Sequence, residues 1–415
     1  MSENNFKIQR DFWENPWGYV ESFFIGFGLM LTGFFLEVFV TSDTIFTLSY
    51  PYNVIFLAGY ILLLFVLYKW FSTSQLIRWL TKVPASISSI VLITILVMIM
   101  GTIPQIPSQN KIINTLGLNH ITTNWAFILI LFQFLTCLGL ISIKRVLQLK
   151  WDNIGFVLNH VGLFLALTAG VLGSGDLQRL TLNVYEGKPS WIAKDIDRKE
   201  VELPFAVFLN DFLIEEYNPK LALVDNSTGS ISNNDGKNLY IVEKGETYYF
   251  NNFEVTIEKY LSSAIRFGMR YEPVNEQGSP PAAFISIKNT ENDSIKKAWI
   301  SSGSFRYPYE SVKISEAYSM VMTIPEAKKF SSDIDILTKD GERIKTVLEV
   351  NKAFKYKGWK IYQLSYDDKM GKWSDLSVIE LVKDPWLPLI YLGIFMMIAG
   401  AMHMFWMGNK ITKNE

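Results

Sequence analysis

The sequence predicts an integral membrane bundle of about six α-helical spans joined to a large, mostly antiparallel β domain outside the membrane. Six segments are almost continuously apolar over about 20 residues, the length at which a helix crosses a bilayer. Residues from about 175 to 384 are instead polar and carry repeated β-strand patterns. The basic residues of the short loops also alternate between rich and poor, as they do in multi-spanning proteins.

The apolar segments are residues 20–40, 53–69, 84–104, 123–143, 154–174 and 386–407. No short signal peptide with a cleavage site is evident, so we interpret the first segment as a retained anchor. The predicted regions are an N-terminal two-span region (1–83), a three-span membrane core (84–174), the outer β-rich domain (175–384), and a final span with its tail (385–415).

Orientation follows from the lysine and arginine residues that flank the spans. The leader, the second loop, the fourth loop and the tail are the basic segments: Lys7, Arg10; Lys69, Arg78, Lys82; Lys144, Arg145, Lys150; Lys410, Lys413. The loop at 41–52 has neither residue type, and the next outer loop has only Lys111. Both termini are therefore predicted to be cytoplasmic, and the large domain extracytoplasmic.

The outer domain has the sequence pattern of an antiparallel sandwich or open barrel. Strand-like runs occur at 203–217, 248–261, 282–289, 319–325 and 359–367, and Asn-Asp-Gly (234–236) and Lys-Asp-Gly (339–341) mark turns. The domain has no histidine, no cysteine, no nucleophile-elbow motif and no phosphate-binding loop. We interpret it as a binding or scaffolding domain rather than a catalytic one.

Charge and cysteine content exclude several functions. A formal net charge of -1 does not indicate nucleic-acid binding. Cys137 is the single cysteine and lies in an apolar run, so disulfides, a CxxC redox pair and cysteine-ligated clusters are excluded within the chain.

His160 is the leading candidate site residue, because it is an imidazole inside the fifth predicted span. Ionisable side chains within a bilayer are costly and usually functional, and neutral imidazole is a common metal ligand. Small residues recur at Gly162, Ala166, Gly170 and Ser174, which favours close helix packing on that face. His160 points away from that face; the alternative to a ligand is a histidine that hydrogen-bonds a neighbouring helix.

The other two histidines are weaker candidates. His403 is placed near the cytoplasmic end of the sixth span, at a depth similar to that of His160, so an axial pair within one chain is conceivable. An interfacial histidine beside Trp406 is its alternative. His120 is in the outer loop before the fourth span, where it is either solvated or a ligand on the exit side.

Two stretches resemble a known family. One is LNHVGLFLALTAGVLGSGD (158–176) leading to LPFAVFLNDFLIEEYNP (203–219); the other is EVNKAFKYKGWKIYQLSYD (349–367) followed by VIELVKDPWLPLIYLGIFMMIAG (378–400). Over roughly residues 123–407 they resemble the ResB-like family of cytochrome c biogenesis proteins, of the System II type. The chain departs from the family pattern at Ala353 and Trp386, and by its two extra N-terminal spans.

The resemblance implies a role in heme handling. ResB-like proteins pair with a CcsA-like membrane protein, export heme b and present it for attachment to apocytochrome c outside the bacterial cytoplasmic membrane. His160 occupies the position of the family's transmembrane heme ligand. This chain has no outer thiols, so a thioredoxin-like protein would act indirectly to keep the substrate cysteines reduced. The chain is therefore expected to be one non-autonomous half of a heme-lyase (synthase) complex.

Two rival functions remain open on the sequence. A membrane-anchored binding or scaffold protein without a cofactor would leave the complex colourless. A small-solute transporter is disfavoured, because paired spans broken by Gly or Pro are not evident.

Overall fold

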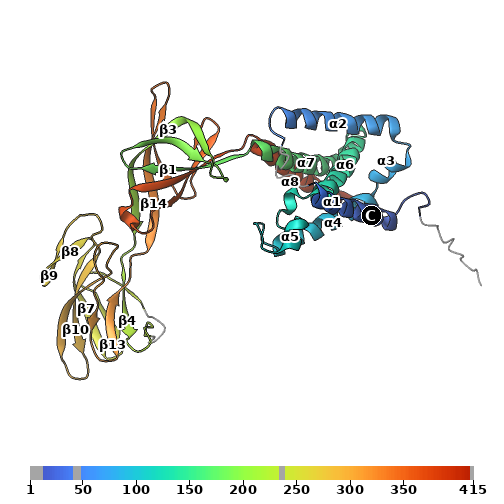
Figure 1. The fold of residues 1–415 in the computed structure, drawn as a ribbon. Helices are drawn as coiled ribbons and strands as arrows, with labels where there is room; N and C mark the ends of the chain where they lie inside the picture. The colour runs from blue at the N-terminus through green and yellow to red at the C-terminus, as the bar shows by residue number, and fades with distance from the viewer. Residues whose placement is uncertain (1–12, 41–47, 233–238, 412–415) are drawn as a thin grey trace, which may run out of the picture. The chain divides into compact units, whose positions relative to one another are not determined.

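The computed structural model describes residues 13–40, 48–232 and 239–411, and the predicted turn at 234–236 lies outside these residues. The chain divides into two compact units. One comprises residues 1–177 with 384–415, and the other residues 178–383 (Figure 1). Each unit is described on its own.

The first unit is helical, and six of its helices are long and apolar enough to cross a membrane. These are α1 (Tyr19–Phe39), α2 (Tyr52–Phe71), α4 (Val83–Thr102), α6 (Trp125–Leu147), α7 (Ile154–Gly173) and α8 (Leu387–Ile411). Shorter elements join them: α3 (Gln75–Leu80), α5 (Lys111–Thr115), η1 (Ile121–Thr123), η2 (Trp151–Asn153) and η3 (Ser174–Asp176). The predicted set of six spans is confirmed within a few residues at each end.

Short polar side chains fix where several helices begin. Asn124 Oδ1 accepts a hydrogen bond from the Ala126 N–H at 2.8 Å, and Asn110 Oδ1 accepts one from Ile112 at 2.9 Å. Both satisfy N–H groups that a helix start leaves without a partner. Glu21, the acidic residue at the start of the first span, accepts from the Gly18 N–H at 2.7 Å and so caps its own helix.

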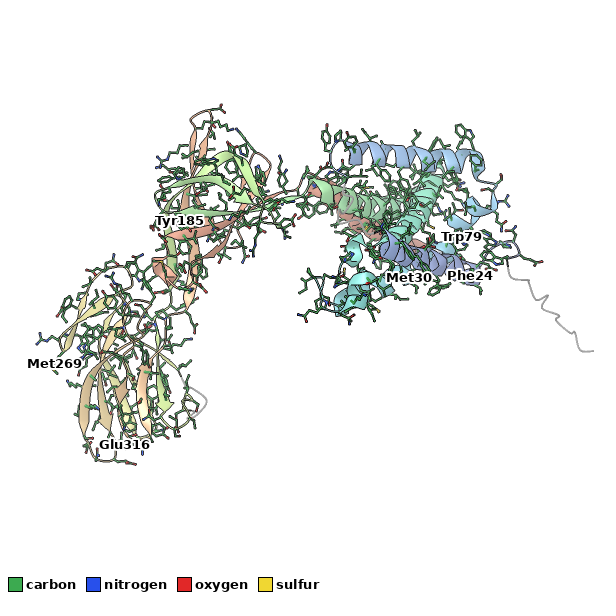
Figure 2. All side chains as sticks on the ribbon, in the orientation of Figure 1. Phe24, Met30, Trp79, Tyr185, Met269 and Glu316 are labelled. Atoms are coloured by element: carbon green, nitrogen blue, oxygen red, sulfur yellow. The ribbon has the colours of Figure 1, made fainter. Side chains whose placement is uncertain are left out.

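The surface of the helical unit is apolar, as lipid requires. Large side chains such as Phe24, 61% exposed, cover it (Figure 2). One polar pair inside the unit joins two helices: the Trp79 indole, only 4% exposed, donates to Ser22 Oγ at 2.8 Å. Together with the six long helices, this distribution makes the chain a membrane protein.

The second unit is built from antiparallel β-strands in four sheets. An eight-stranded sheet has the order β15 (Arg343–Glu349), β14 (Ala327–Thr338), β3 (Glu200–Glu216), β2 (Pro189–Lys194), β1 (Gln178–Tyr185), β18 (Leu376–Lys383), β17 (Trp359–Tyr366), β16 (Phe354–Tyr356). The 3₁₀ turn η4 (Gly371–Trp373) lies between β17 and β18.

The remaining strands form two four-stranded sheets and a hairpin. One sheet has the order β11 (Ile295–Ser301), β10 (Ala282–Asn289), β7 (Phe253–Leu261), β6 (Thr247–Phe250). The other has the order β12 (Val312–Lys313), β13 (Tyr318–Met322), β4 (Lys220–Asp225), β5 (Tyr240–Ile241), and the hairpin is β8 (Ala264–Phe267) with β9 (Arg270–Pro273). The mostly antiparallel prediction is confirmed.

Alternation along the strands builds two separate hydrophobic cores. In β3, every second side chain from Leu203 to Leu209 is buried, because successive side chains point to opposite faces of a sheet. These residues belong to the core of the eight-stranded sheet. A second core joins the two four-stranded sheets and includes Leu221, Val255, Ile285 and Met320. The predicted Lys339–Gly341 turn connects β14 to β15, with Gly341 at φ 84°.

Candidate functional site

His160 lies in the second turn of α7, and its own helix fixes its ring. Nδ1 is 3.0 Å from the Phe156 carbonyl oxygen, and the ring stacks on that of Phe156 with centroids 3.7 Å apart. A carbonyl can only accept, so the neutral imidazole carries its proton on Nδ1 and keeps the Nε2 lone pair. Iron-ligating histidines commonly donate their second N–H to a carbonyl in this way. The ring therefore fits a heme ligand.

Arg145, on the last turn of α6, completes a three-layered arrangement with these two rings. Its guanidinium carbon lies 5.0 Å from the centre of the Phe156 ring. A cation over an aromatic face is attracted by the ring quadrupole. We call this arrangement the Arg145–Phe156–His160 stack. It joins the end of α6 to the start of α7.

Helices α7 and α8 touch through glycines on the opposite side of α7. A Cβ added to Gly162 would lie 2.6 Å from the Gly393 carbonyl oxygen, and one on Gly400 would lie 2.7 Å from that of Gly155. Only glycine allows backbones to approach this closely. Gly162, from the small-residue stripe predicted by sequence, lies in this contact. Gly170, from the same stripe, is exposed with open space beside it.

His403 faces the start of α7. Its ring meets Trp151 edge-on at 5.6 Å, and its Nδ1 would lie 2.9 Å from a Cβ on Gly155. Both ring nitrogens are buried and, within the described part of the chain, lack a hydrogen-bond partner. Gly155 precedes His160 by five residues, about 7 Å along a helix. His160 and His403 thus contact different neighbours, at different levels of the same helix pair.

His120 is held by Glu37, near the end of α1, and by Asn119, in the loop before α6. Its Nε2 is 2.9 Å from Glu37 Oε1, and its Nδ1 is 3.0 Å from Asn119 Oδ1. The second oxygen of Glu37 accepts from the Trp125 N–H at 3.1 Å, at the start of α6. Both nitrogens of His120 are therefore engaged within the chain, and the ring clamps α1 to the loop before α6.

A porphyrin-bound iron would need fewer protein donors at this site than a chelated ion would. Within residues 13–40, 48–232 and 239–411, His, Cys, Asp and Glu side chains do not converge in groups of three or more. A chelated ion needs such a group. A heme needs only axial side chains from the protein, because the porphyrin supplies the equatorial ligands.

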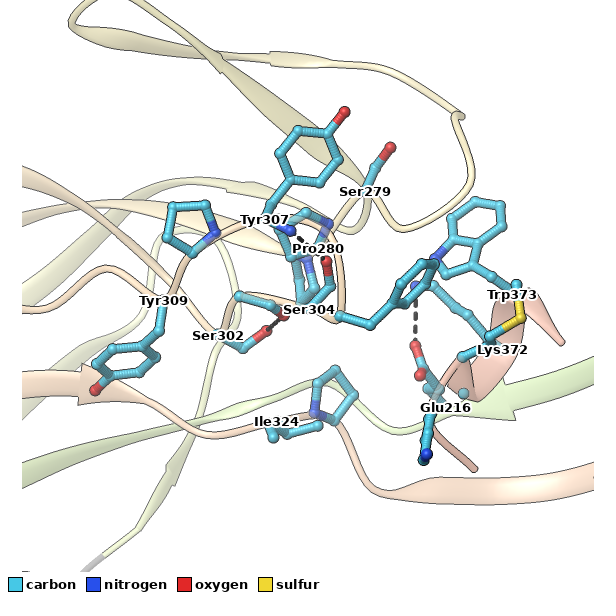
Figure 3. Close-up of a pocket in the computed structure, with 18 of the residues that line it drawn as sticks. Glu216, Ser279, Pro280, Ser302, Ser304, Tyr307, Tyr309, Ile324, Lys372 and Trp373 are labelled. Atoms are coloured by element: carbon cyan, nitrogen blue, oxygen red, sulfur yellow. Dashed lines mark hydrogen bonds and ion pairs between the residues drawn. The ribbon is translucent and has the colours of Figure 1, made fainter. Parts of the chain in front are cut away.

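The second unit, residues 178–383, contains a pocket that the sequence did not predict. It has a volume of about 370 Å³, and Figure 3 shows Tyr307, Tyr309, Ile324 and Trp373 around it. At one wall, Lys372 Nζ donates to Glu216 Oε2 at 2.9 Å. Prolines stand beside the aromatic residues on its walls: Pro280, Pro281, Pro308 and Pro325. The sequence pattern that could have indicated this pocket is the repeated occurrence of proline next to aromatic or serine residues in loops.

Comparison with known protein families gives a match to part of the chain. Residues 305–378 match the ResB-like family model, and no curated protein matches the chain. The matched segment runs from Phe305, in the pocket wall, through β12–β17 to the first residues of β18. It overlaps the second of the two stretches from which the resemblance was drawn. Over this segment the chain is similar to the ResB-like family.

Proposed function

We propose that this chain is the ResB-like subunit of a System II cytochrome c synthase complex, where it helps to export heme b and to present it to apocytochrome c. The family match supports involvement in cytochrome c biogenesis at a general level. The observation that carries the finer proposal is the hydrogen bond from His160 Nδ1 to the Phe156 carbonyl. It leaves Nε2 of an intramembrane imidazole free to accept a metal bond.

In this proposal His160 is one axial ligand of the heme that is being transported. The positive-inside pattern puts the start of α7 at the cytoplasmic side, where heme enters. The second ligand comes from a CcsA-like partner, because His403 contacts Trp151 and Gly155 rather than the Phe156 side of α7. His120 has a bracing role, since Glu37 and Asn119 occupy both of its nitrogens.

The outer pocket is the proposed contact for apocytochrome c. Rigid aromatic and proline side chains bind extended peptides without losing much conformational freedom. The Glu216–Lys372 pair at its wall offers both charges to a peptide backbone or side chain. Reduction of the substrate cysteines falls to a thioredoxin-like protein, because the outer domain has no thiol.

The test is co-purification of the chain with its CcsA-like partner, followed by visible spectroscopy. We expect a heme b spectrum in the wild type and a loss of most of its intensity in His160→Ala. Added imidazole should restore part of the spectrum, because it replaces the missing ligand. His120→Ala is the matched control and should retain the spectrum, since both of its nitrogens already have partners.

Two outcomes would overturn the proposal. A spectrum unchanged in His160→Ala would remove this residue from the ligand role. A colourless wild-type complex, with cytochrome c maturation intact after deletion of the chain, would favour the alternative function of a membrane-anchored scaffold without a cofactor. The outer pocket is the feature that favours this alternative, because it can bind a peptide with or without heme nearby.

A further inference from the structure

We propose that Arg145 is the carboxylate-binding residue of the His160 site, and that an apolar groove between α2, α6 and α7 receives one edge of the porphyrin. This inference rests on the proposed function and deepens it, because it names the groups that recognise the two ends of an amphiphilic ligand. The anionic end is a pair of propionates, and the apolar end is the macrocycle.

The stack sets the distance between the cation and the imidazole. The guanidinium carbon is 5.0 Å from the Phe156 centroid, and that centroid is 3.7 Å from the His160 centroid. The two distances add to 8.7 Å, which is an upper bound on the separation of Arg145 from the imidazole centre. A heme ligated by His160 can span this separation, because its propionates extend outward from one edge of the ring.

Arg145 has no anionic partner among the residues that the structure describes. Its Nε is buried without a hydrogen bond, and within the described residues no carboxylate forms an ion pair with it. An arginine held over an aromatic ring is suited to bind a carboxylate with two parallel hydrogen bonds. A buried donor without a partner is costly, so an anion that paired with this guanidinium would stabilise the arrangement.

The groove supplies the apolar part of the site. It has a volume of about 260 Å³ and lies between Leu64 of α2, Gly139 of α6 and Phe164 of α7, with further walls from the same three helices. The one polar side chain among these walls is that of Ser142, whose hydroxyl donates to the Leu138 carbonyl at 2.7 Å. The surface presented to a ligand is therefore apolar, as a macrocycle requires.

Sequence neighbours connect the groove to the stack. Val161 and Phe164, both in its wall, lie one and four residues after His160, and Val146 follows Arg145. His160 and Arg145 do not line the groove themselves, but both stand next to residues that do, on two of the helices that bound it. In this proposal a bound heme keeps its carboxylates near the membrane surface and one edge of its macrocycle among the apolar walls. The α2 wall also gives the two additional N-terminal spans a role.

A different explanation of Arg145 is a purely topological charge that contacts lipid headgroups. Lys144 is the natural control, because it is the adjacent residue, carries the same charge and belongs to the same basic loop. Replacement of either residue removes one cytoplasmic charge. Only the replacement of Arg145 removes a cation from the Phe156 face.

The test measures binding of hemin and of hemin dimethyl ester to the purified full chain in lipid nanodiscs. The ester has the same macrocycle and iron but no free carboxylates. We expect Arg145→Gln to weaken hemin binding about tenfold or more, which is the loss expected for a charge-assisted hydrogen bond. Binding of the ester should be equal in wild type and variant. Arg145→Lys should bind hemin with intermediate affinity, and Lys144→Gln should match wild type for both ligands.

Three results would overturn the inference. Equal weakening of hemin and ester in Arg145→Gln would show that the residue only supports Phe156 by packing. Equal losses in Arg145→Gln and Lys144→Gln would assign the effect to lipid or to general charge. Unchanged hemin affinity in Arg145→Gln would exclude any role in binding. Failure of the proposed function is distinguishable, because wild type would then bind hemin no better than His160→Ala does.

Discussion

At the scale of single residues, Asp176 joins the ends of three helices, α2, α7 and α8. One oxygen accepts from the Tyr50 N–H at 2.7 Å, and the other accepts from Asn53 Nδ2 at 2.8 Å and from the Trp386 indole at 2.7 Å. Trp386 is one of the two positions at which the sequence departs from the pattern of the family it resembles. It fits because Gly173 has no side chain: a Cβ there would lie 2.5 Å from that of Trp386.

Replacement of this acceptor should loosen the helical unit. In Asp176→Ala, three N–H groups lose a charged acceptor. We expect the free energy of unfolding to fall by about 2–5 kcal/mol, because such hydrogen bonds are each worth about 1.5–3 kcal/mol and are not additive. Trp386→Phe removes only one of the three donors and should cost less. Asp152→Ala, at an exposed acidic residue of η2, should change stability little. Thermal unfolding in detergent, followed by tryptophan fluorescence, measures these differences, and equal shifts in Asp176→Ala and Asp152→Ala would contradict the expectation.

A second residue-scale prediction concerns acid stability of the outer unit. Hydrogen bonds from Lys329 and Lys352 lower the pKa of Glu349 to about 2. A carboxyl group whose folded pKa lies below its unfolded pKa stabilises the fold above the unfolded value, and this contribution is lost as the pH falls through the folded value. The loss is therefore expected between about pH 4.5 and pH 2.

Glu349→Gln should remove that part of the pH dependence. Unfolding of residues 178–383 by urea, measured at a series of pH values, should give a flatter curve in the variant below pH 4.5 than in wild type. Glu316→Gln is a suitable comparison, because Glu316 is also paired with a lysine, Lys313, but is almost fully exposed. A Glu349→Gln curve as steep as that of wild type would assign the acid sensitivity to other carboxyl groups.

At the scale of elements, the α7–α8 contact depends on particular glycines. We expect Gly162→Ala to destabilise the helical unit by about 1–3 kcal/mol, because the added Cβ would meet the Gly393 carbonyl oxygen and force the helices apart. Gly170→Ala lies in the same helix, where nothing is within 4 Å of the added atom. That control should be neutral or slightly stabilising, because alanine favours helix. Comparable unfolding temperatures for the two variants would contradict the assigned contact face.

Sequence periodicity located these elements but not the contact between them. Runs of about 20 apolar residues identified every span, and alternation identified the main strands, because both patterns are local. The stripe from Gly162 to Ser174 was inferred with a period of four from α7 alone. The actual face also uses Gly155, and its partners are Gly393 and Gly400, more than 200 residues further along the chain. Which glycines meet depends on the angle and position at which the two helices cross. That geometry cannot be inferred from the sequence of one helix.

At the scale of the whole molecule, the same limit applies to the candidate site. His160 was identifiable because an imidazole in a span is rare. Arg145 was counted only as an orientation signal, because its place over Phe156 depends on how α6 turns into α7. The outer pocket was not predicted at all. Its walls come from loops near residues 280, 305 and 370, each of which is unremarkable by itself.

The outer unit is expected to fold without the membrane helices. Every strand of residues 178–383 pairs within that range, and both of its cores are complete there. The chain enters and leaves through one strand pair, because Gln178 pairs with Lys383, so the two cut ends would lie side by side. Residues 178–383 expressed alone should therefore be soluble and unfold cooperatively, with the circular dichroism of a β protein.

A pair of matched substitutions tests whether this fragment has the described fold. Leu182 is fully buried in the core of the eight-stranded sheet, whereas Leu213 of β3 is 51% exposed. Leu182→Asp should lower the free energy of unfolding by more than about 4 kcal/mol, which is much of the stability of a typical domain. The variant should therefore show no cooperative unfolding transition. Leu213→Asp introduces the same charge at a solvent-facing position and should leave the transition nearly unchanged. A fragment that stays unfolded as wild type, while the full chain is folded, would show that the outer unit depends on the helices that carry it.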